Sequence, residues 1–138
     1  MAMHLGVTGT KEGMTEKQFN VFLKMLSEMQ FTHLHEGDCV GVDNEVTIIV
    51  KHEKPEVIVV RHPPIKKHYQ AFGPYDETWP DKDYLVRDQD NVNCSDYIFA
   101  FPKGEEVIRS GTWATVRYAR KKGIPITIIM PNGEVRYE

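Results

Sequence analysis

Residues 96–101, Asp-Tyr-Ile-Phe-Ala-Phe, form a short apolar run that ends at Pro102. The run predicts a buried β-strand. An amphipathic segment at residues 112–122 predicts a helix that ends at Gly123, a residue type that favours the left-handed conformation after a helix. Between them lies the small-residue sequence Arg109-Ser-Gly-Thr112. A strand that leads through a glycine turn into a helix is the repeating unit of folds with parallel sheets.

The same order of strand and helix repeats on both sides of this segment. Further strands are expected at residues 3–8, 31–35, 56–61 and 125–130, and further helices at residues 42–52, at 81–93 and after the capping box Thr15–Gln18. The β-branched residues of Val46–Val50 have poor helix propensity, which argues against the helix expected at 42–52. We therefore expect an α/β fold, a single doubly wound Rossmann-like three-layer domain over residues 1–138. Its mostly parallel five-stranded sheet would have the order 3-2-1-4-5.

Residues 62–82 form the longest stretch without periodicity, and they contain four prolines and several aromatic residues. Long loops in compact domains are often lids or binding loops. The alternative is an ordered surface loop that its own aromatic side chains hold in place.

Composition limits the classes of function. A length of 138 residues suits one domain, and 41% apolar with 27% charged residues excludes a disordered or fibrous chain. The net charge of −3 argues against nucleic-acid binding through bulk positive charge, although a local basic site stays open. Two cysteines form no disulfide framework, and neither a spanning segment nor a secretory signal is visible. We expect a soluble cytoplasmic protein with no membrane partner.

Three turns between a strand and a helix are rich in small residues, at 6–10, 36–43 and 109–112. Small residues let a ligand approach the backbone, where free N–H groups and the helix dipole favour a phosphate. In the expected sheet, the turns at Gly9 and at 110–112 would face each other across the crevice where the winding reverses. The candidate ligand-binding residues are Gly9, Thr10, Gly37, Asp38, Asp43, Arg87, Arg109, Ser110, Gly111 and Thr112.

These side chains offer specific contacts. Arg87 and Arg109 could clamp a phosphate or carboxylate, or form surface ion pairs. Asp38 and Asp43 could accept hydrogen bonds from ribose hydroxyls, and Asp43 could equally cap a helix. Cys39 lies in a glycine turn that could lower its pKa, but a packing role is the default interpretation. No Cys-x-x-Cys or His-Glu-x-x-His pattern occurs, so we expect no metal site and no cofactor.

Five segments together, residues 6–10, 36–43, 85–92, 95–102 and 109–119, resemble the SLOG superfamily. This group includes the LOG (LONELY GUY) phosphoribohydrolases, the YspA-like proteins and the Rossmann-like domain of the DNA-processing protein A. The resemblance runs from about Leu5 to Met130, and it implies a nucleotide or nucleotide-derived ligand.

The resemblance also implies roles for individual residues. Residues 110–112 match the phosphate-binding turn, and Gly9 with Thr10 match the contact of the first loop. Gly37 and Asp43 match the contact of the second loop. Arg87 matches an arginine of the third helix in the enzymatic members.

The chain departs from the LOG pattern Gly-Gly-x-Gly-Thr-x-x-Glu, in which the glutamate is a catalytic acid or base. Thr115 stands at the glutamate position, and Ile108 and Arg109 replace the first two glycines. A threonine cannot supply a carboxylate. Hydrolysis in the LOG manner would therefore need a substitute among the acids Asp38, Asp43, Glu105 and Glu106.

Three functions are open on this evidence. The leading hypothesis is a sensor or sequestering module that binds a nucleotide-derived signalling ligand, ADP-ribose-like or a cyclic nucleotide. The alternative is a nucleoside or nucleotide N-glycosidase, either a phosphoribohydrolase or a deoxyribosyltransferase-like enzyme. Single-stranded nucleic acid is a third candidate, motivated by the basic residues 117–122 and the aromatic residues 69–79, but the acidic balance makes it the least favoured. We also expect a homo-oligomer that pairs near the helix at 112–122, where Trp113 could pack on a partner or on a base.

Overall fold

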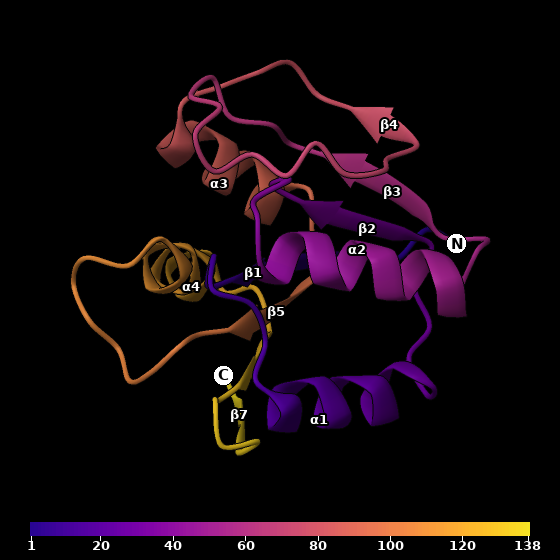
Figure 1. The fold of residues 1–138 in the computed structure, drawn as a ribbon, viewed down its shortest axis with the longest axis vertical. Coiled ribbons are helices and arrows are strands. Elements are labelled where there is room, and N and C mark those ends of the chain that lie inside the picture. Colours follow the sequence, from indigo (N-terminus) through magenta and orange to yellow (C-terminus); the bar gives the residue numbers. More distant parts are fainter.

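The computed structural model describes residues 1–138 and has a central sheet with helices on both faces (Figure 1). The strands are β1 (His4–Gly9), β2 (His33–Glu36), β3 (Ile58–Arg61), β4 (Glu77–Thr78), β5 (Tyr97–Phe101), β6 (Ile126–Ile129) and β7 (Val135–Tyr137). The helices are α1 (Glu16–Leu26), α2 (Val42–Glu53), α3 (Tyr84–Asn93) and α4 (Gly111–Lys122). None of these helices combines the length and the apolar character that crossing a membrane requires.

The sheet has seven strands in the order β4-β3-β2-β1-β5-β6-β7, so the expected five strands and their order were wrong as a description of the whole sheet. All neighbours are parallel except β6 and β7. The two additional strands lie at the edges and contain two and three residues. Their residues are too few and too polar to produce a periodic signal, which explains why the sequence did not reveal them.

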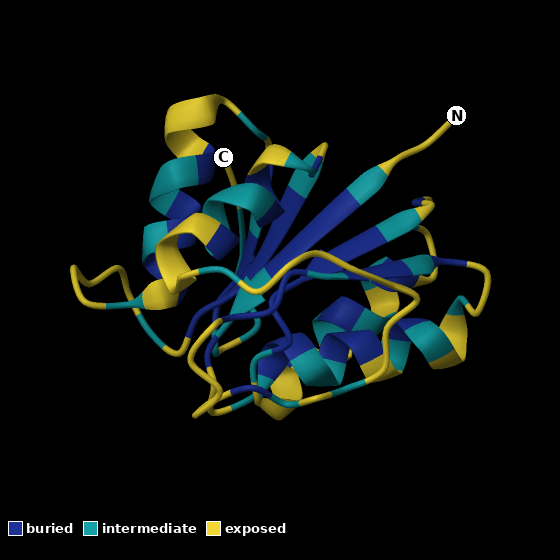
Figure 2. Cartoon of the chain, turned by 90° about the horizontal axis from the view of Figure 1, so that it is seen from above, coloured by how far each residue is buried: buried dark blue, intermediate teal, exposed yellow.

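Apolar side chains cover both faces of the sheet, and Figure 2 shows the buried residues concentrated in the strands and on the inward sides of the helices. Alternate side chains of β5 point to opposite faces of the sheet and belong to two separate hydrophobic cores. Phe99 and Phe101 pack with α1 and α2, and Ile98 and Ala100 pack with α4. The predicted helix at 42–52 is confirmed as α2, because burial of Val46 and Val50 against the sheet outweighs their poor helix propensity.

The ends of the helices follow local side-chain chemistry. Thr15 and Gln18 form the predicted capping box, with hydrogen bonds of 3.1 and 2.9 Å between each side chain and the other residue's backbone N–H. The Gln18 amide also donates to the carbonyl oxygens of Pro102 at 2.9 Å and Ile129 at 2.8 Å. Gly123 adopts the left-handed conformation that ends α4, with φ of 72°.

Candidate ligand site at the carboxyl edge of the sheet

The chain leaves β1, β2 and β5 at the same edge of the sheet, and the backbone just after β1 contacts both the end of β5 and the start of α2. The Thr10 amide donates to the carbonyl of Phe101 at 3.1 Å, and the Val42 amide donates to the carbonyl of Thr10 at 3.1 Å. The winding of the sheet reverses between β1 and β5, with β2 on one side of β1 and β6 beyond β5. In open α/β sheets, this is the position where ligands bind.

The second turn, residues 36–43, is held together by its own side chains. The Asp43 carboxylate accepts hydrogen bonds from the amides of Gly37 at 3.0 Å and Cys39 at 3.4 Å. Arg87 donates from Nη1 to the carbonyl of Gly37. A Cβ atom on Gly37 would lie 2.5 Å from Nη1 of Arg87, so glycine is required here for close approach of the guanidinium. The structure therefore brings Gly37, Asp43 and Arg87 together, and they contact one another.

Asp38 fixes the long loop to this turn. Its carboxylate accepts hydrogen bonds from the Gln70 side chain at 2.9 Å and from the amides of Phe72 at 3.2 Å and Gly73 at 2.9 Å. Arg61 adds an ion pair at 3.7 Å, and Asp38 is only 2% exposed. The loop at 62–82 is thus ordered, and it is anchored by Asp38, which the sequence marked as a candidate ribose contact.

Glu36 is a buried acid that the sequence reasoning missed. Its carboxylate accepts a hydrogen bond from the Asp38 amide, and the side chain is 1% exposed. Burial, with the charge of Asp43 second, raises the pKa of Glu36 well above its ordinary value. Burial also raises the pKa of Asp43 to about 6, against the opposing effect of the Arg87 guanidinium. The alternation of polar and apolar residues in β2 does not reveal that this acid is buried, because Glu36 occupies the last position of the strand.

Arg87 also connects the second turn to a carboxyl group that faces α4. Its Nε donates to the Asp88 carboxylate at 2.7 Å, and Asp88 lies near Thr115. The Thr115 hydroxyl lies 3.0 Å from the carbonyl of Gly111, in the first turn of α4. The Asp88 side chain is 25% exposed, and burial raises its pKa. A half-buried carboxyl group therefore lies between α3 and the start of α4.

We number each turn by the helix that follows it, so residues 109–112, which precede α4, form the fourth turn. This turn is open by comparison. Ser110 caps α4 by accepting a hydrogen bond from the Trp113 amide at 3.2 Å. The amides of Gly111 and Thr112 are the first of the helix and have no acceptor within the fold. A Cβ atom on Gly111 would meet nothing within 4 Å, and the exposed Arg109 has no ion-pair partner.

The first turn is closed by packing. A Cβ atom on Gly9 would lie 2.4 Å from Val42, so this glycine lets the start of α2 approach β1. Thr10 is buried, and its hydroxyl accepts a hydrogen bond from the Glu12 amide at 3.2 Å. Trp113 belongs to α4, and its side chain is also buried in the core. This burial corrects the expectation that it contacts a base or a partner.

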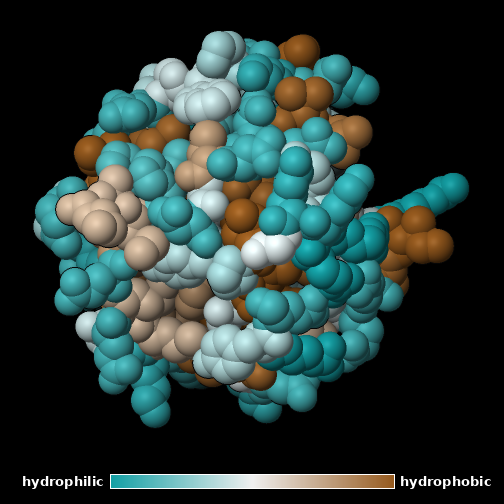
Figure 3. Space-filling view, turned by 180° about the vertical axis from the view of Figure 1, so that it is seen from behind, coloured by the Kyte–Doolittle hydropathy of each residue, from teal (hydrophilic) through white to brown (hydrophobic).

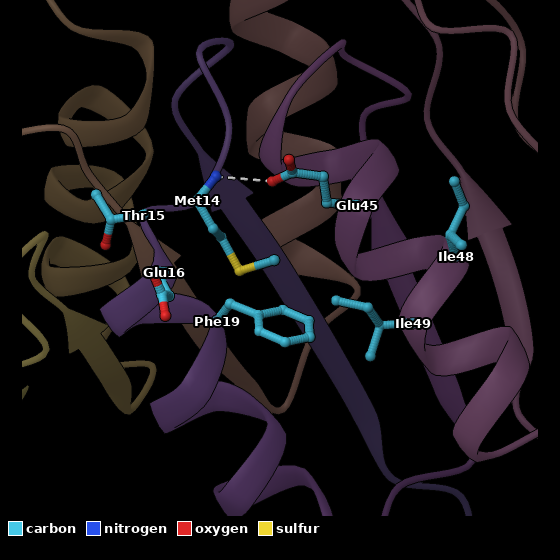
Figure 4. A pocket seen from close by; sticks show the side chains of 7 residues that line it. All are labelled: Met14, Thr15, Glu16, Phe19, Glu45, Ile48 and Ile49. Atoms are coloured by element: carbon cyan, nitrogen blue, oxygen red, sulfur yellow. Dashed lines mark hydrogen bonds between the residues drawn. The ribbon is translucent and has the colours of Figure 1, made fainter.

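Two other surface features lie outside these turns. An open groove of about 360 Å³ separates the starts of α1 and α2, and Phe19, Ile48 and Ile49 line it (Figure 4). Glu45 lies at its rim and accepts a hydrogen bond from the Met14 amide at 2.7 Å. On the opposite side of the molecule, hydrophobic side chains are scattered among hydrophilic ones (Figure 3). The groove contains no residue that the sequence assigned to the site.

Comparisons with known proteins identify the fold. No protein family matches the chain, and no curated protein matches its sequence. A solved structure of TM1055, a structural genomics target, superposes with a TM-score of 0.66 and 17% identity over 90% of this chain and 72% of that chain. DNA processing protein A from Helicobacter pylori, described for its single-stranded DNA binding mode, gives a TM-score of 0.62 and 15% identity over 91% of this chain. The present chain spans 64% of the Helicobacter protein. These similarities show a Rossmann-like fold.

Proposed function

We propose that this chain is a SLOG-type domain that binds a nucleotide or nucleotide-derived ligand, with a phosphate on the turn before α4. The observation that carries the proposal is the free first turn of α4. The amides of Gly111 and Thr112 have no acceptor, and the space beside Gly111 is open. Backbone N–H groups at a helix start and the positive end of the helix dipole favour a phosphate.

Charge around this turn supports an anionic ligand. Arg109 is exposed and unpaired beside the free amides, whereas Arg87 is 7% exposed and already bonded to Gly37 and Asp88. We therefore assign the phosphate contact to Arg109, Ser110, Gly111 and Thr112. Arg87 and Asp43 instead stabilise the conformation of the second turn beside the crevice. Gly9 and Thr10 form the floor of the crevice.

A ligand-holding role suits the chemistry of the turn better than catalysis does. Thr115 occupies the position where the LOG pattern has its catalytic glutamate, and its hydroxyl is bonded within the helix. We accordingly favour a sensor or sequestering module for an ADP-ribose-like molecule or a cyclic nucleotide. Pairing into a homo-oligomer is part of this proposal, and light scattering of the purified chain tests it separately.

N-glycosidic hydrolysis is the second candidate, and Asp88 is the observation that favours it. Glu105 is paired with Arg136, Glu106 with Arg117, and Asp38 with the loop, whereas Asp88 is paired with Arg87 between α3 and α4. Asp88 lies next to the crevice, and its raised pKa helps it to retain a proton. In such a reaction, water would attack the anomeric carbon, the carbon–nitrogen bond would break, and Asp88 would give its proton to the departing base; a proton from the attacking water would then return to the Asp88 carboxylate.

Single-stranded DNA is the third candidate ligand. The Helicobacter neighbour is described for binding it, which weakens the expectation that nucleic acid is not a partner. The exposed side chains of Phe72 and Tyr75 could stack on bases. In contrast, Arg117 and Arg120 are paired with Glu106, which reduces the positive charge available for phosphates.

The decisive experiment measures binding of AMP, ADP-ribose, NAD, cyclic AMP and a labelled oligonucleotide by calorimetry or fluorescence anisotropy. Arg109→Glu should weaken binding of the phosphorylated ligands about tenfold or more, because it reverses the charge beside the free amides. Lys103→Glu is the matched control, with the same charge change at the other end of the same loop. Absence of binding by every compound at millimolar concentration would refute the proposal, and chromatography of the same mixtures would detect released base.

A further inference from the structure

The interface between α3 and the back of the sheet contains a cluster of metal-ligand side chains. His35 at β2 and His62 just after β3 are 3% and 1% exposed, and Cys94 caps the end of α3 beside them. One ring nitrogen of each histidine and the Sγ atom of Cys94 all lie within 4.8 Å of one another. The three residues come from three separate segments, so no short sequence motif contains them.

The histidines form a hydrogen-bonded row that leaves one nitrogen without a partner. Nδ1 of His4 lies 2.8 Å from Nε2 of His35, and Nδ1 of His35 lies 2.9 Å from Nε2 of His62. Nδ1 of His62 is buried and has no hydrogen-bond partner. Reversing the tautomers of all three rings changes donors into acceptors but leaves this nitrogen unpaired. A buried polar atom without a partner is unfavourable, so it indicates a ligand.

Both rings belong to a side-chain type that commonly ligates metals, and the charged groups around His62 are Asp90, Arg87 and Lys82. Neutral imidazole is a common metal ligand, and two imidazoles with one thiolate suit zinc and copper.

We propose that His35, His62 and Cys94 bind one thiophilic transition-metal ion, Zn²⁺ or Cu⁺. In a tetrahedral zinc site, ligand atoms lie about 3.3–3.6 Å apart, given metal–nitrogen and metal–sulfur bonds of about 2.0 and 2.3 Å. The present separations of up to 4.8 Å therefore require movements of about 1 Å, within reach of side-chain rotation. The metal binds the unpartnered Nδ1 of His62, one ring nitrogen of His35 and the Sγ atom of Cys94, and the Cys94 thiol releases its proton to solvent as the sulfur–metal bond forms.

Such an ion would join the end of α3 directly to β2 and β3. The contacts of α3 in this region are polar, including the buried Asn91 and Arg87, rather than the apolar packing on the other face. A metal bond would therefore add a direct link where Asn91 and Arg87 make polar contacts. The site is separate from the turn before α4, so metal binding and nucleotide binding can be measured independently.

Titration of the chelator-treated, reduced full-length chain with Co²⁺ tests the proposal. We expect one equivalent to bind and to produce a thiolate-to-cobalt charge-transfer band, which added Zn²⁺ abolishes. Cys94→Ser should remove the band, and Cys39→Ser, which changes the other cysteine, should retain it. Native mass spectrometry with Zn²⁺, and with Cu⁺ under a competing chelator, identifies which ion is held more tightly.

Thermal unfolding provides a second readout. Zn²⁺ at about 100 times its dissociation constant should raise Tm of the wild type and of Cys39→Ser by about 5–10 °C, and it should leave Tm of Cys94→Ser unchanged. Circular dichroism confirms that the metal-free Cys94→Ser variant is folded. The proposal is overturned if the wild type binds none of the three ions stoichiometrically, or if Cys94→Ser binds them as the wild type does. Neither result affects the nucleotide panel, which is run on metal-free protein.

Discussion

The second and fourth turns lie at the same edge of the sheet, yet they satisfy their polar groups in opposite ways. In the second turn, Asp43 and Arg87 bond to the backbone of Gly37, and Asp38 bonds to the long loop. In the fourth turn, the amides of Gly111 and Thr112 have no acceptor and Arg109 has no partner. The same kind of small-residue sequence thus produces a turn closed by its own side chains in one place and a turn with free backbone donors in the other.

Removal of the Arg87 guanidinium should give the largest effect. Arg87→Met leaves the buried carboxyl groups of Glu36 and Asp43 without a neighbouring cation, so the free energy of unfolding should fall by about 3–5 kcal/mol. Urea denaturation followed by circular dichroism measures the loss. Arg109→Met, at the open turn, should change stability by less than about 0.5 kcal/mol. Equal losses in the two variants would contradict the contrast between the turns.

Protonation of Asp43 should make the second turn more stable at low pH. The folded pKa of about 6 lies above the ordinary value of 3.8, so the folded state holds a proton that the unfolded state has released between these values. The contribution is fully present below about pH 4 and is lost as pH rises through about 6, with a total of about 3 kcal/mol.

Asp43→Asn isolates this contribution, because exposed carboxylates such as Glu105 and Glu106 shift stability in the opposite direction. The difference in the free energy of unfolding between wild type and variant should fall between pH 4.5 and 6.5. A difference that is constant or that grows over this range would show that Asp43 is ionised in the folded protein.

A pair of matched glycine substitutions compares the two turns directly. Gly37→Ala places a Cβ atom 2.5 Å from Nη1 of Arg87, which must move, so we expect a loss of about 1–3 kcal/mol. Gly111→Ala meets nothing within 4 Å and should stay within about 0.5 kcal/mol of the wild type. Thermal unfolding of both variants measures the difference. The contrast fails if Gly111→Ala is the more destabilising of the two.

Much of the fold could be predicted because its signals are local. The capping box at Thr15, the apolar run before Pro102 and the glycine that ends α4 each follow from a few neighbouring residues. The edge strands β4 and β7 could not be predicted, because pairing with a neighbouring strand, rather than composition, defines segments of two or three residues.

The candidate site, too, could be predicted only where its signals are local. The turns and Arg87 were identified from sequence, but which of their polar groups are bonded within the protein depends on contacts across the chain. Asp38 meets residues more than 30 positions away, and Arg87 meets Gly37 from 50 positions away. Glu36, Asp88 and the cluster of His35, His62 and Cys94 likewise become recognisable only when the folded chain brings their partners together.

The amide of Gln18 has a consequence for how the chain folds. The Gln18 amide donates hydrogen bonds to the carbonyl groups of Pro102 and Ile129, which are 84 and 111 positions away. Because Ile129 follows Gln18 by 111 positions, the first helix cannot find its final anchoring until the ribosome has made the chain as far as β6. The helix α1 and the strand β6 should therefore acquire stability together rather than one after the other.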